Sequence, residues 1–451
     1  MRARSAFTIV AAFAVAACSN DPALSLPDAR SLIDAPALVD ARPLGCASPT
    51  GAGTHEGSVN TAATWTAADS PHDITFDINV YAPLTIEACA VVRIGAGVTV
   101  TVVAGSSLTA IGASGRPVTF ERLDAGSAWA TIRSQDGDIS LTHVIVNGGG
   151  APLNTLPAYT AAIRLQSDTG GSLHVDDVEI ADSESQGVYI NGTIGFDETS
   201  QDLRVHGSVG FPVHVYARVI GTIPSGEYTG NGRDEIGIAG SGGAVLDNQT
   251  MHDRGVPYHV GSGQDGGRMD VSAQSGVAVL TIEPGVTVRF PPGGTLNIEE
   301  FSSTDPATGA LVAIGTADKP ITFTSDQTPG AAGDWLGIGL GGFVDPATTL
   351  DNVIVAFAGG PGTGSNSCPY PLRTGQNDAA IRIFGTAGPL TQFITNTQIV
   401  KSLRDGIDRG WRDDVFTDFL DTNSFDVGVG GCKESVPRTF NGVCPESPAC
   451  P

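Results

Sequence analysis

The chain has 451 residues, of which 41% are hydrophobic and 16% are charged, so it holds enough apolar side chains to bury a core and is not wholly disordered. Glycine supplies 59 residues, about twice its ordinary share, without a Gly-X-Y period, which excludes collagen and favours a fold rich in turns. The formal net charge of −24, with no basic cluster, argues against nucleic-acid binding.

Residues 1–17 have the features of a secretion signal. Two arginines precede an apolar stretch, 6–17, that is shorter than the roughly 20 residues a membrane-spanning helix needs. The stretch ends in Val-Ala-Ala-Cys, which resembles the lipobox of bacterial lipoproteins, whose cysteine becomes the lipidated first residue. The resemblance implies that acylated Cys18 anchors the chain in a lipid bilayer. An ordinary signal peptide with an incidental cysteine is the alternative.

Residues 18–45 are expected to form a disordered tether. Four prolines break helices there, and an Asp-Ala pair recurs every six residues with leucines in phase. A small apolar docking strip made by these leucines is the alternative. Ser19 and Asn20 follow the cysteine where many inner-membrane lipoproteins have an aspartate, so sorting to the outer membrane is expected, on its periplasmic face or at the cell surface.

Short β-branched runs then begin about every ten residues, separated by Gly, Asn, Asp and Ser, and no segment keeps a helical apolar period. The chain is therefore predicted to be all-β. This spacing suits a β-sandwich or a parallel β-solenoid. Few hairpin turns and an interior of Val, Ile and Leu favour the solenoid, with about fifteen coils of roughly 20–25 residues. A pair of sandwiches is the alternative.

Two parts of the chain carry the same runs in the same order, and the distance between partners only grows along the chain. This pattern predicts a tandem duplication with loop insertions, giving a first half at 46–255, a second half at 256–430 and a Cys-rich cap or tail at 431–451. The matched pairs are Leu84–Glu87 with Leu280–Glu283, Gly112–Phe120 with Gly315–Phe323, Trp129 with Trp335, Val144–Val146 with Val353–Val355, Ala161–Arg164 with Ala379–Arg382, and Ser183 and Gly187 with Ser402 and Gly406.

The second half carries a more specific resemblance. Leu280–Phe290, followed by Leu311–Ser325, Trp335–Ile338 and Leu350–Val355, resembles the right-handed parallel β-helix repeat proteins of secreted and lipidated Gram-negative surface proteins, a pectate-lyase-like fold. The resemblance covers most of both halves and implies one right-handed parallel β-helix. In the first half, Cys89 replaces the glycine of a Pro-Gly turn. Proteins of this fold include lyases, hydrolases, adhesins and spacers, so the fold alone does not assign a function.

Six cysteines follow Cys18, and an even number outside the cytoplasm predicts disulfides, for which 15 pairings exist. A metal site is disfavoured because no CxxC motif and no neighbouring histidine occur. Proximity in the sequence favours the pairs Cys46–Cys89, Cys368–Cys432 and Cys444–Cys450.

Motifs for known chemistry are scarce. No HExxH, G-x-S-x-G or phosphate-binding Gly-Lys motif occurs, so no cofactor and no metal are expected. Gly230–Ile236, which contains Asp234, partly fits a calcium-binding nonapeptide, but calcium sites of this type stack consecutive repeats and this match is single. A solvated turn is the preferred interpretation of Asp234.

The densest polar cluster lies at 401–414. Lys401 or Arg404 is a candidate base, Asp405 and Asp408 are candidate carboxylates, and Trp411 is a candidate platform for stacking a sugar ring. The first half lacks these residues at its matching positions, so the cluster is not part of the shared pattern. The alternative is a solvated turn where the solenoid meets its cap, with salt bridges of little energy.

The matched tryptophans, Trp129 and Trp335, are expected to pack structurally, with exposed sugar platforms as the alternative. The matched arginines, Arg93 with Arg289 and Arg164 with Arg382, are expected to lie on an outer face, with glycan contact as the alternative. The leading hypothesis is a non-catalytic, monomeric surface lipoprotein that binds a glycan or an envelope protein. The alternatives are a polysaccharide lyase or glycoside hydrolase that uses the 401–414 cluster, and a structural envelope spacer without a ligand.

Overall fold

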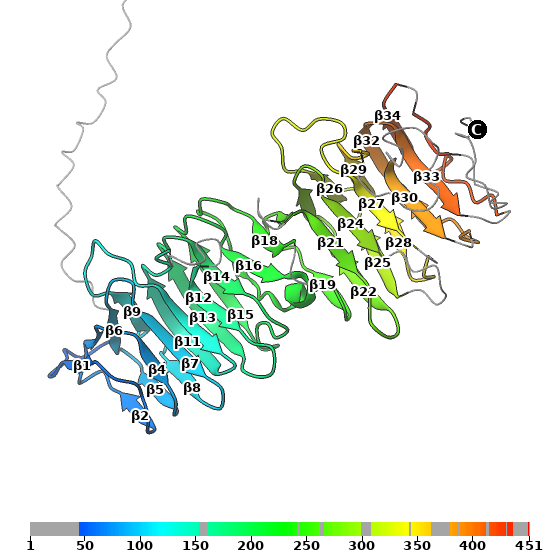
Figure 1. The fold of residues 1–451 in the computed structure, drawn as a ribbon. Coiled ribbons are helices and arrows are strands. Elements are labelled where there is room, and N and C mark those ends of the chain that lie inside the picture. The colour runs from blue at the N-terminus through cyan, green and yellow to red at the C-terminus, as the bar shows by residue number, and fades with distance from the viewer. Residues whose placement is uncertain are drawn as a thin grey trace, which may run out of the picture. The chain divides into compact units, whose positions relative to one another are not determined.

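The computed structural model describes residues 45–152, 160–240, 244–261, 266–298, 308–341, 344–361, 379–385, 388–411, 415–429, 431–435 and 450. These residues form parallel β-sheets and a short 3-10 helix, η2 (Ala217–Thr222) (Figure 1). Cys18, the predicted signal and the tether up to residue 44 lie outside the described ranges. No helix among the described residues has the length and apolar character that crossing a membrane requires.

Two long sheets dominate the fold, one of 11 and one of 13 strands. The 11-stranded sheet contains β1 (Gly53–His55), β2 (Ala63–Trp65), β3 (His72–Ile74), β5 (Leu84–Glu87), β6 (Val91–Ile94), β8 (Ser107–Ile111), β9 (Val118–Arg122), β11 (Asp138–Asn147), β13 (Leu173–Ala181), β15 (Gln201–His206) and β17 (Gly226–Glu227). The 13-stranded sheet contains β4 (Ile78–Val80), β7 (Thr99–Val103), β10 (Thr131–Gln135), β12 (Ala161–Gln166), β14 (Gln186–Ile190), β16 (Val213–Tyr216), β18 (Ile236–Ala239), β20 (Tyr258–Val260), β23 (Thr287–Phe290), β26 (Ile321–Ser325), β29 (Val353–Ala356), β32 (Gln398–Ser402) and β34 (Ser424–Val427).

Two sheets of five strands each accompany the second part of the 13-stranded sheet. One contains β19 (Gln249–Met251), β22 (Ala278–Ile282), β25 (Gly309–Ile314), β28 (Thr349–Asp351) and β31 (Ile394–Thr395). The other contains β21 (Arg268–Val271), β24 (Thr295–Ile298), β27 (Gly337–Leu340), β30 (Ala379–Gly385) and β33 (Asp405–Trp411).

Neighbouring strands in these sheets pair in parallel and in register, which is consistent with the predicted β-solenoid and not with hairpin-built sandwiches. The 13-stranded sheet receives one strand from each turn of the chain. Ile163 pairs with Val188, 25 positions later, whereas Ile354 pairs with Gln398, 44 positions later. The predicted coil length of roughly 20–25 residues therefore fits the shorter coils, and longer connections enlarge the later ones.

Alternate residues of each strand point into the solenoid and form its core. Along the 13-stranded sheet one inward position is apolar in coil after coil, so each coil covers the apolar side of the next. Its members, each at most 2% exposed, are Val100, Ile132, Ile163, Val188, Val213, Ile236, Tyr258, Val288, Phe323 and Val355.

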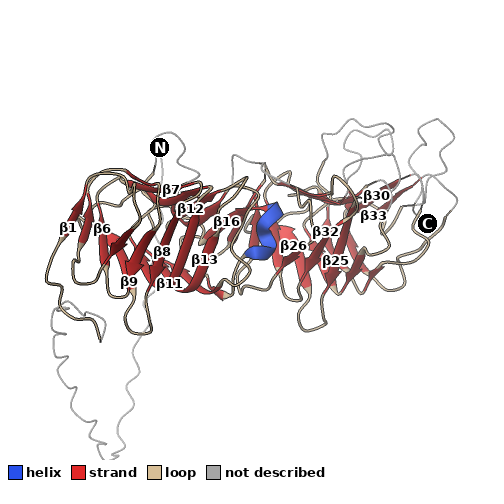
Figure 2. Ribbon diagram, turned by 90° about the horizontal axis from the view of Figure 1, so that it is seen from below, coloured by secondary structure: helices blue, strands red, loops and turns tan. Residues whose placement is uncertain are grey.

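The middle of the chain is where the sheets change. The 11-stranded sheet ends at β17 and the five-stranded sheets begin at β19 and β21, so only the 13-stranded sheet continues. Helix η2 contacts β16, β18 and β19 at this junction (Figure 2). Runs matched in the sequence accordingly occupy different sheets: Val144–Val146 lies in the 11-stranded sheet and Val353–Val355 in the 13-stranded sheet.

Trp129 and Trp335 are completely buried, as their matched positions predict. Each indole N–H donates to a backbone carbonyl, that of Asn147 at 3.1 Å and that of Ala356 at 2.8 Å respectively. Both tryptophans are therefore packing residues, with their one polar atom satisfied.

Candidate functional site

The predicted polar cluster lies at the last strand of a five-stranded sheet. Asp405, Asp408 and Trp411 belong to β33, and Lys401 lies near the end of β32. The segment 431–435 runs alongside β33, where Gly406 N–H donates to the Cys432 carbonyl and Ser435 N–H donates to the Ile407 carbonyl, both at 2.9 Å. We call this segment the C-terminal cap. It covers an edge that would otherwise present unpaired backbone groups.

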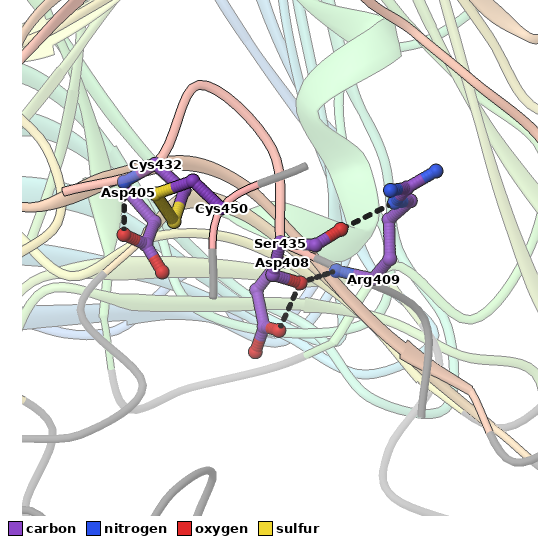
Figure 3. The surroundings of a disulfide bond; sticks show 6 residues. All are labelled: Asp405, Asp408, Arg409, Cys432, Ser435 and Cys450. Carbon is purple, nitrogen blue, oxygen red and sulfur yellow. Dashed lines mark hydrogen bonds between the residues drawn. A yellow bond between two sulfur atoms is a disulfide. The ribbon is translucent and has the colours of Figure 1, made fainter. Parts of the chain in front are cut away.

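The two candidate carboxylates hold this cap in place. Asp405 Oδ1 accepts a hydrogen bond from the Cys432 N–H at 2.7 Å, and Asp408 Oδ1 accepts one from Ser435 Oγ at 3.1 Å (Figure 3). The same Ser435 hydroxyl accepts the backbone N–H of Arg409. Asp408 is 2% exposed. Both side chains therefore bind backbone and side-chain groups of the cap. The cluster lies where the solenoid meets its cap, but on a strand with Asp408 buried, and not in the solvated turn of the alternative interpretation.

A buried ion pair lies beside them. Arg409 Nη2 is 3.2 Å from Glu434 Oε1, and both side chains are almost fully buried. Glu434 Oε2 also accepts the Phe419 N–H at 3.1 Å. Burial raises the pKa of Glu434, opposed by that hydrogen bond and by the charge of Arg409. Sequence analysis did not identify this pair, because the two residues meet only when the cap folds onto β33.

The other described members of the cluster, Trp411, Lys401 and Arg404, do not form an open site, and residues 412–414 lie outside the described ranges. Trp411 is completely buried and its indole N–H donates to the Val415 carbonyl at 2.8 Å, so no ring face is available to a sugar. The prediction of a stacking platform is therefore corrected. The Lys401 ammonium lies 5.4 Å from the centre of the Phe357 ring, and Arg404 is exposed. The carboxylates face the cap, whereas Lys401 packs on an aromatic ring.

The disulfides are Cys46–Cys89, as predicted, and Cys432–Cys450. The predicted partners of Cys432 and Cys450 were wrong: the Cα atoms of these two residues lie 5.2 Å apart, a normal disulfide separation. Cys368 and Cys444 lie outside the described residues. Two disulfides indicate an oxidising, extracytoplasmic environment.

The calcium candidate Asp234 accepts the backbone N–H of Asn231 at 2.7 Å, which is the geometry of a closed polar turn. Within the described ranges, no three His, Cys, Asp or Glu side chains gather in a way that would hold a metal ion.

A different group of side chains lies on the outer face of the 13-stranded sheet. Strand pairing places one outward position of seven consecutive strands of this sheet in register. We call these residues the outer row: Arg133, Arg164, Tyr189, His214, Gly237, His259 and Arg289. The sequence contains a signal for part of it, since Arg164 ends a matched run, but only the register shows that these residues are neighbours.

The middle of the outer row is a buried aromatic stack. Tyr189 and His214 have ring centres 5.1 Å apart, and Phe211 lies 5.4 Å from His214 and 5.8 Å from His259. Tyr189, His214 and His259 are each at most 2% exposed. Gly237 leaves the space that Phe211 and His214 occupy, because a Cβ there would be 2.9 Å from each ring. The stack is a rigid floor between the two ends of the row.

One end of the row is neutralised by acids. Glu235 accepts hydrogen bonds from Arg289 Nη1 at 2.7 Å and Arg233 Nη2 at 3.0 Å. Arg233 also lies over the Phe211 ring at 4.5 Å. His259 Nε2 is 3.2 Å from Asp326 Oδ2, whereas its buried Nδ1 has no hydrogen-bond partner. The acids thus balance both arginines and orient the histidine.

The other end consists of Arg133 and Arg164, on the adjacent strands β10 and β12. Arg164 is 8% exposed, donates from Nε to Asn191 Oδ1 at 3.3 Å and lies 5.8 Å from the Tyr189 ring centre. Burial lowers the pKa of Arg164. The neighbouring Tyr189 acts to raise this pKa, and the positive charge of Arg133 lowers it further. Arg133 is partly exposed, and its buried Nε has no hydrogen-bond partner.

Comparison with known proteins adds no assignment. No protein-family model matches the chain, and neither the curated proteins nor the solved structures give a significant match.

Proposed function

We propose that this protein is a non-catalytic, monomeric lipoprotein of the outer membrane, held by acylated Cys18, that binds a glycan on the outer row of a right-handed parallel β-helix. The disulfides support the extracytoplasmic location. The lipobox-like sequence supports the anchor. An envelope protein is the alternative ligand.

The observation that carries this proposal is the concentration of cationic and aromatic side chains on one sheet face of an acidic chain. Four arginines lie on or beside the outer row, and one end of the row reaches solvent: the Arg233 and Arg289 side chains are 42% and 41% exposed. Guanidinium groups present planar arrays of N–H donors to ligand oxygens. The aromatic floor contacts two of them, Arg164 at the Tyr189 ring and Arg233 at the Phe211 ring, which restrains these guanidinium groups before a ligand arrives and lowers the ordering cost of binding.

The proposed duplication is supported by like environments at matched positions. Arg164 and Arg382 are 8% and 7% exposed. Ser183 Oγ donates to the carbonyl of Gln186 at 2.6 Å, and Ser402 Oγ donates to that of Asp405 at 2.7 Å. Because matched runs occupy different sheets in the two halves, we infer that the second copy is displaced by one sheet at the junction. Both copies then lie along one axis, which agrees with the 13-stranded sheet running through both halves.

The test is binding of the full chain, purified in detergent, to immobilised acidic and neutral polysaccharides. We expect binding that Arg289→Gln and Arg233→Gln weaken, whereas Arg93→Gln leaves it unchanged, because Arg93 lies on the 11-stranded sheet and not in the outer row. Absence of binding to every polysaccharide and to envelope proteins would favour the structural spacer.

The enzyme alternative is tested in the same samples. A polysaccharide lyase or glycoside hydrolase would shorten one of the polysaccharides, and Arg404→Ala would abolish that activity if the 401–414 cluster were responsible. We expect every polysaccharide to keep its length, because Asp405 and Asp408 bind the C-terminal cap.

A further inference from the structure

Arg133 and Arg164 are two like charges that the fold holds next to each other. They are register partners on neighbouring parallel strands, which lie about 4.8 Å apart, and both occupy the outward position. Guanidinium groups stay charged even when partly buried. Their proximity is therefore an unfavourable feature of the chain alone.

Within the described part of the chain, neither arginine has a carboxylate partner. Arg164 contacts an amide oxygen and a tyrosine ring, and the Arg133 Nε is buried without any hydrogen bond. The connection that leads into β12, residues 151–160, contains no Asp or Glu. In contrast, Arg93, Arg233, Arg289 and Arg409 each face a carboxylate within 3.2 Å. Arg122 and Arg254 donate instead to backbone carbonyls. Among the described residues, Arg133 and Arg164 differ in placing two adjacent guanidinium groups together without a carboxylate.

The two guanidinium groups are also partly positioned. Asn191 and Tyr189 hold Arg164, whose side chain is too buried to reorient freely. A donor that is buried and unsatisfied costs free energy, and a ligand oxygen that accepts from it recovers that cost. Guanidinium groups match the oxygens of carboxylates, sulfates and phosphates with paired, charge-assisted hydrogen bonds.

We propose that Arg133 and Arg164 form a binding site for an oxyanion, a carboxylate, sulfate or phosphate group carried by an extracytoplasmic ligand. This proposal rests on the proposed function where it assigns the oxyanion to a larger glycan ligand. The oxyanion itself is recognised by the two arginines. Asn191 and Tyr189 act as positioning residues for Arg164.

The experiment measures thermal unfolding of the full chain in detergent with sodium sulfate, sodium phosphate or sodium glucuronate, each against sodium chloride of equal ionic strength. A ligand that binds only the folded state raises the unfolding temperature in proportion to its affinity. We expect at least one oxyanion to raise it beyond chloride, and the three salts distinguish sulfate, phosphate and carboxylate. Arg164→Gln and Arg133→Gln should each weaken the apparent affinity at least about tenfold.

Two controls keep the result interpretable. Without an added anion, Arg133→Gln should unfold at or above the wild-type temperature, because it removes a like-charge contact. Arg164→Gln also loses the contacts to Asn191 and Tyr189, so a single cooperative unfolding transition is the evidence that it folds. Arg93→Gln should lower stability, since Asp73 loses its partner, yet keep the full anion response.

Equal anion responses in the wild type and in both arginine variants would overturn the site. Anion binding at the arginines without binding of any polysaccharide would leave the site standing and reject the glycan proposal. Polysaccharide binding that survives both substitutions would leave the glycan proposal standing and would reject the two arginines as its binding site.

Discussion

The two ends of the outer row carry the same residue type on the same sheet face, yet they differ in charge balance. At one end Glu235 binds Arg233 and Arg289; at the other, Arg133 and Arg164 have no described carboxylate partner. Glu235 lies two positions before the row residue Gly237 in the sequence. The corresponding residue is Ala162 before Arg164 and Gly187 before Tyr189. A single acidic position thus separates the end of the row whose arginines are neutralised from the end whose arginines are not.

The largest effect is expected at the C-terminal cap, because Arg409, which pairs with the cap residue Glu434, is both neutralised and buried. Glu434→Gln removes the charge that faces Arg409 and leaves a buried guanidinium uncompensated. We expect the free energy of unfolding to fall by about 3–5 kcal/mol. Chemical denaturation at neutral pH measures it, with the exposed Asp421→Asn as control, for which a change within about 0.5 kcal/mol is expected. A change as small as that of the control would show that the cap does not depend on this pair.

The floor between the two ends is tested by filling the space at Gly237. Gly237→Ala places a Cβ 2.9 Å from both Phe211 and His214, so the stack must shift. A loss of about 1–3 kcal/mol in the free energy of unfolding is expected from overpacking. Gly126→Ala is the matched control, since its Cβ meets nothing within 4 Å. Similar losses in both variants would mean that the stack is not tightly packed.

The neutralised end is tested by Glu235→Gln. The substitution keeps the shape of the side chain but removes the charge that Arg233 and Arg289 share. A loss of about 1 kcal/mol is expected, because both arginines are about two-fifths exposed and solvent screens their interaction. The contrast with Arg133→Gln, for which no loss is expected, is the sharpest form of the comparison. A larger loss for Arg133→Gln than for Glu235→Gln would reverse it.

A smaller effect is expected at the first strand, where two histidines form a second pair of facing groups. His55 Nε2 lies 3.1 Å from His72 Nδ1, and the His55 ring stacks on Trp65 at 4.1 Å. Burial lowers the pKa of His55 below its ordinary value of 6.5, the charge of His72 lowers it further, and Asp73 opposes both. The folded state therefore favours neutral His55.

Because the unfolded chain takes up this proton first, stability is full above pH 6.5 and falls as pH decreases from 6.5 to the lowered pKa of His55. Unfolding curves recorded between about pH 8 and about pH 5 should show a shallower pH dependence for His55→Phe, which keeps an aromatic ring on Trp65. An unchanged slope would mean that His55 does not titrate differently in the folded state.

The sequence predicted those features that depend on local pattern and composition. Alternating apolar residues in short runs predicted strands, and their repeated order predicted parallel coils, because a run with one apolar face must be covered by an equivalent neighbour. The burial of Trp129 and Trp335 followed from their matched positions in that pattern. The Cys46–Cys89 bond followed from proximity in the sequence, a rule that gave the wrong partner for Cys432.

The tertiary structure alone decided which residues face one another across coils. Arg133 and Arg164 are 31 positions apart and become neighbours only through the register of β10 and β12. Asp405, Asp408 and Arg409 form a dense polar run in the sequence, yet their partners arrive with residues 431–435, which fold back on β33. Strand alternation is fixed by adjacent residues, whereas charge balance depends on connections whose path the sequence pattern does not encode.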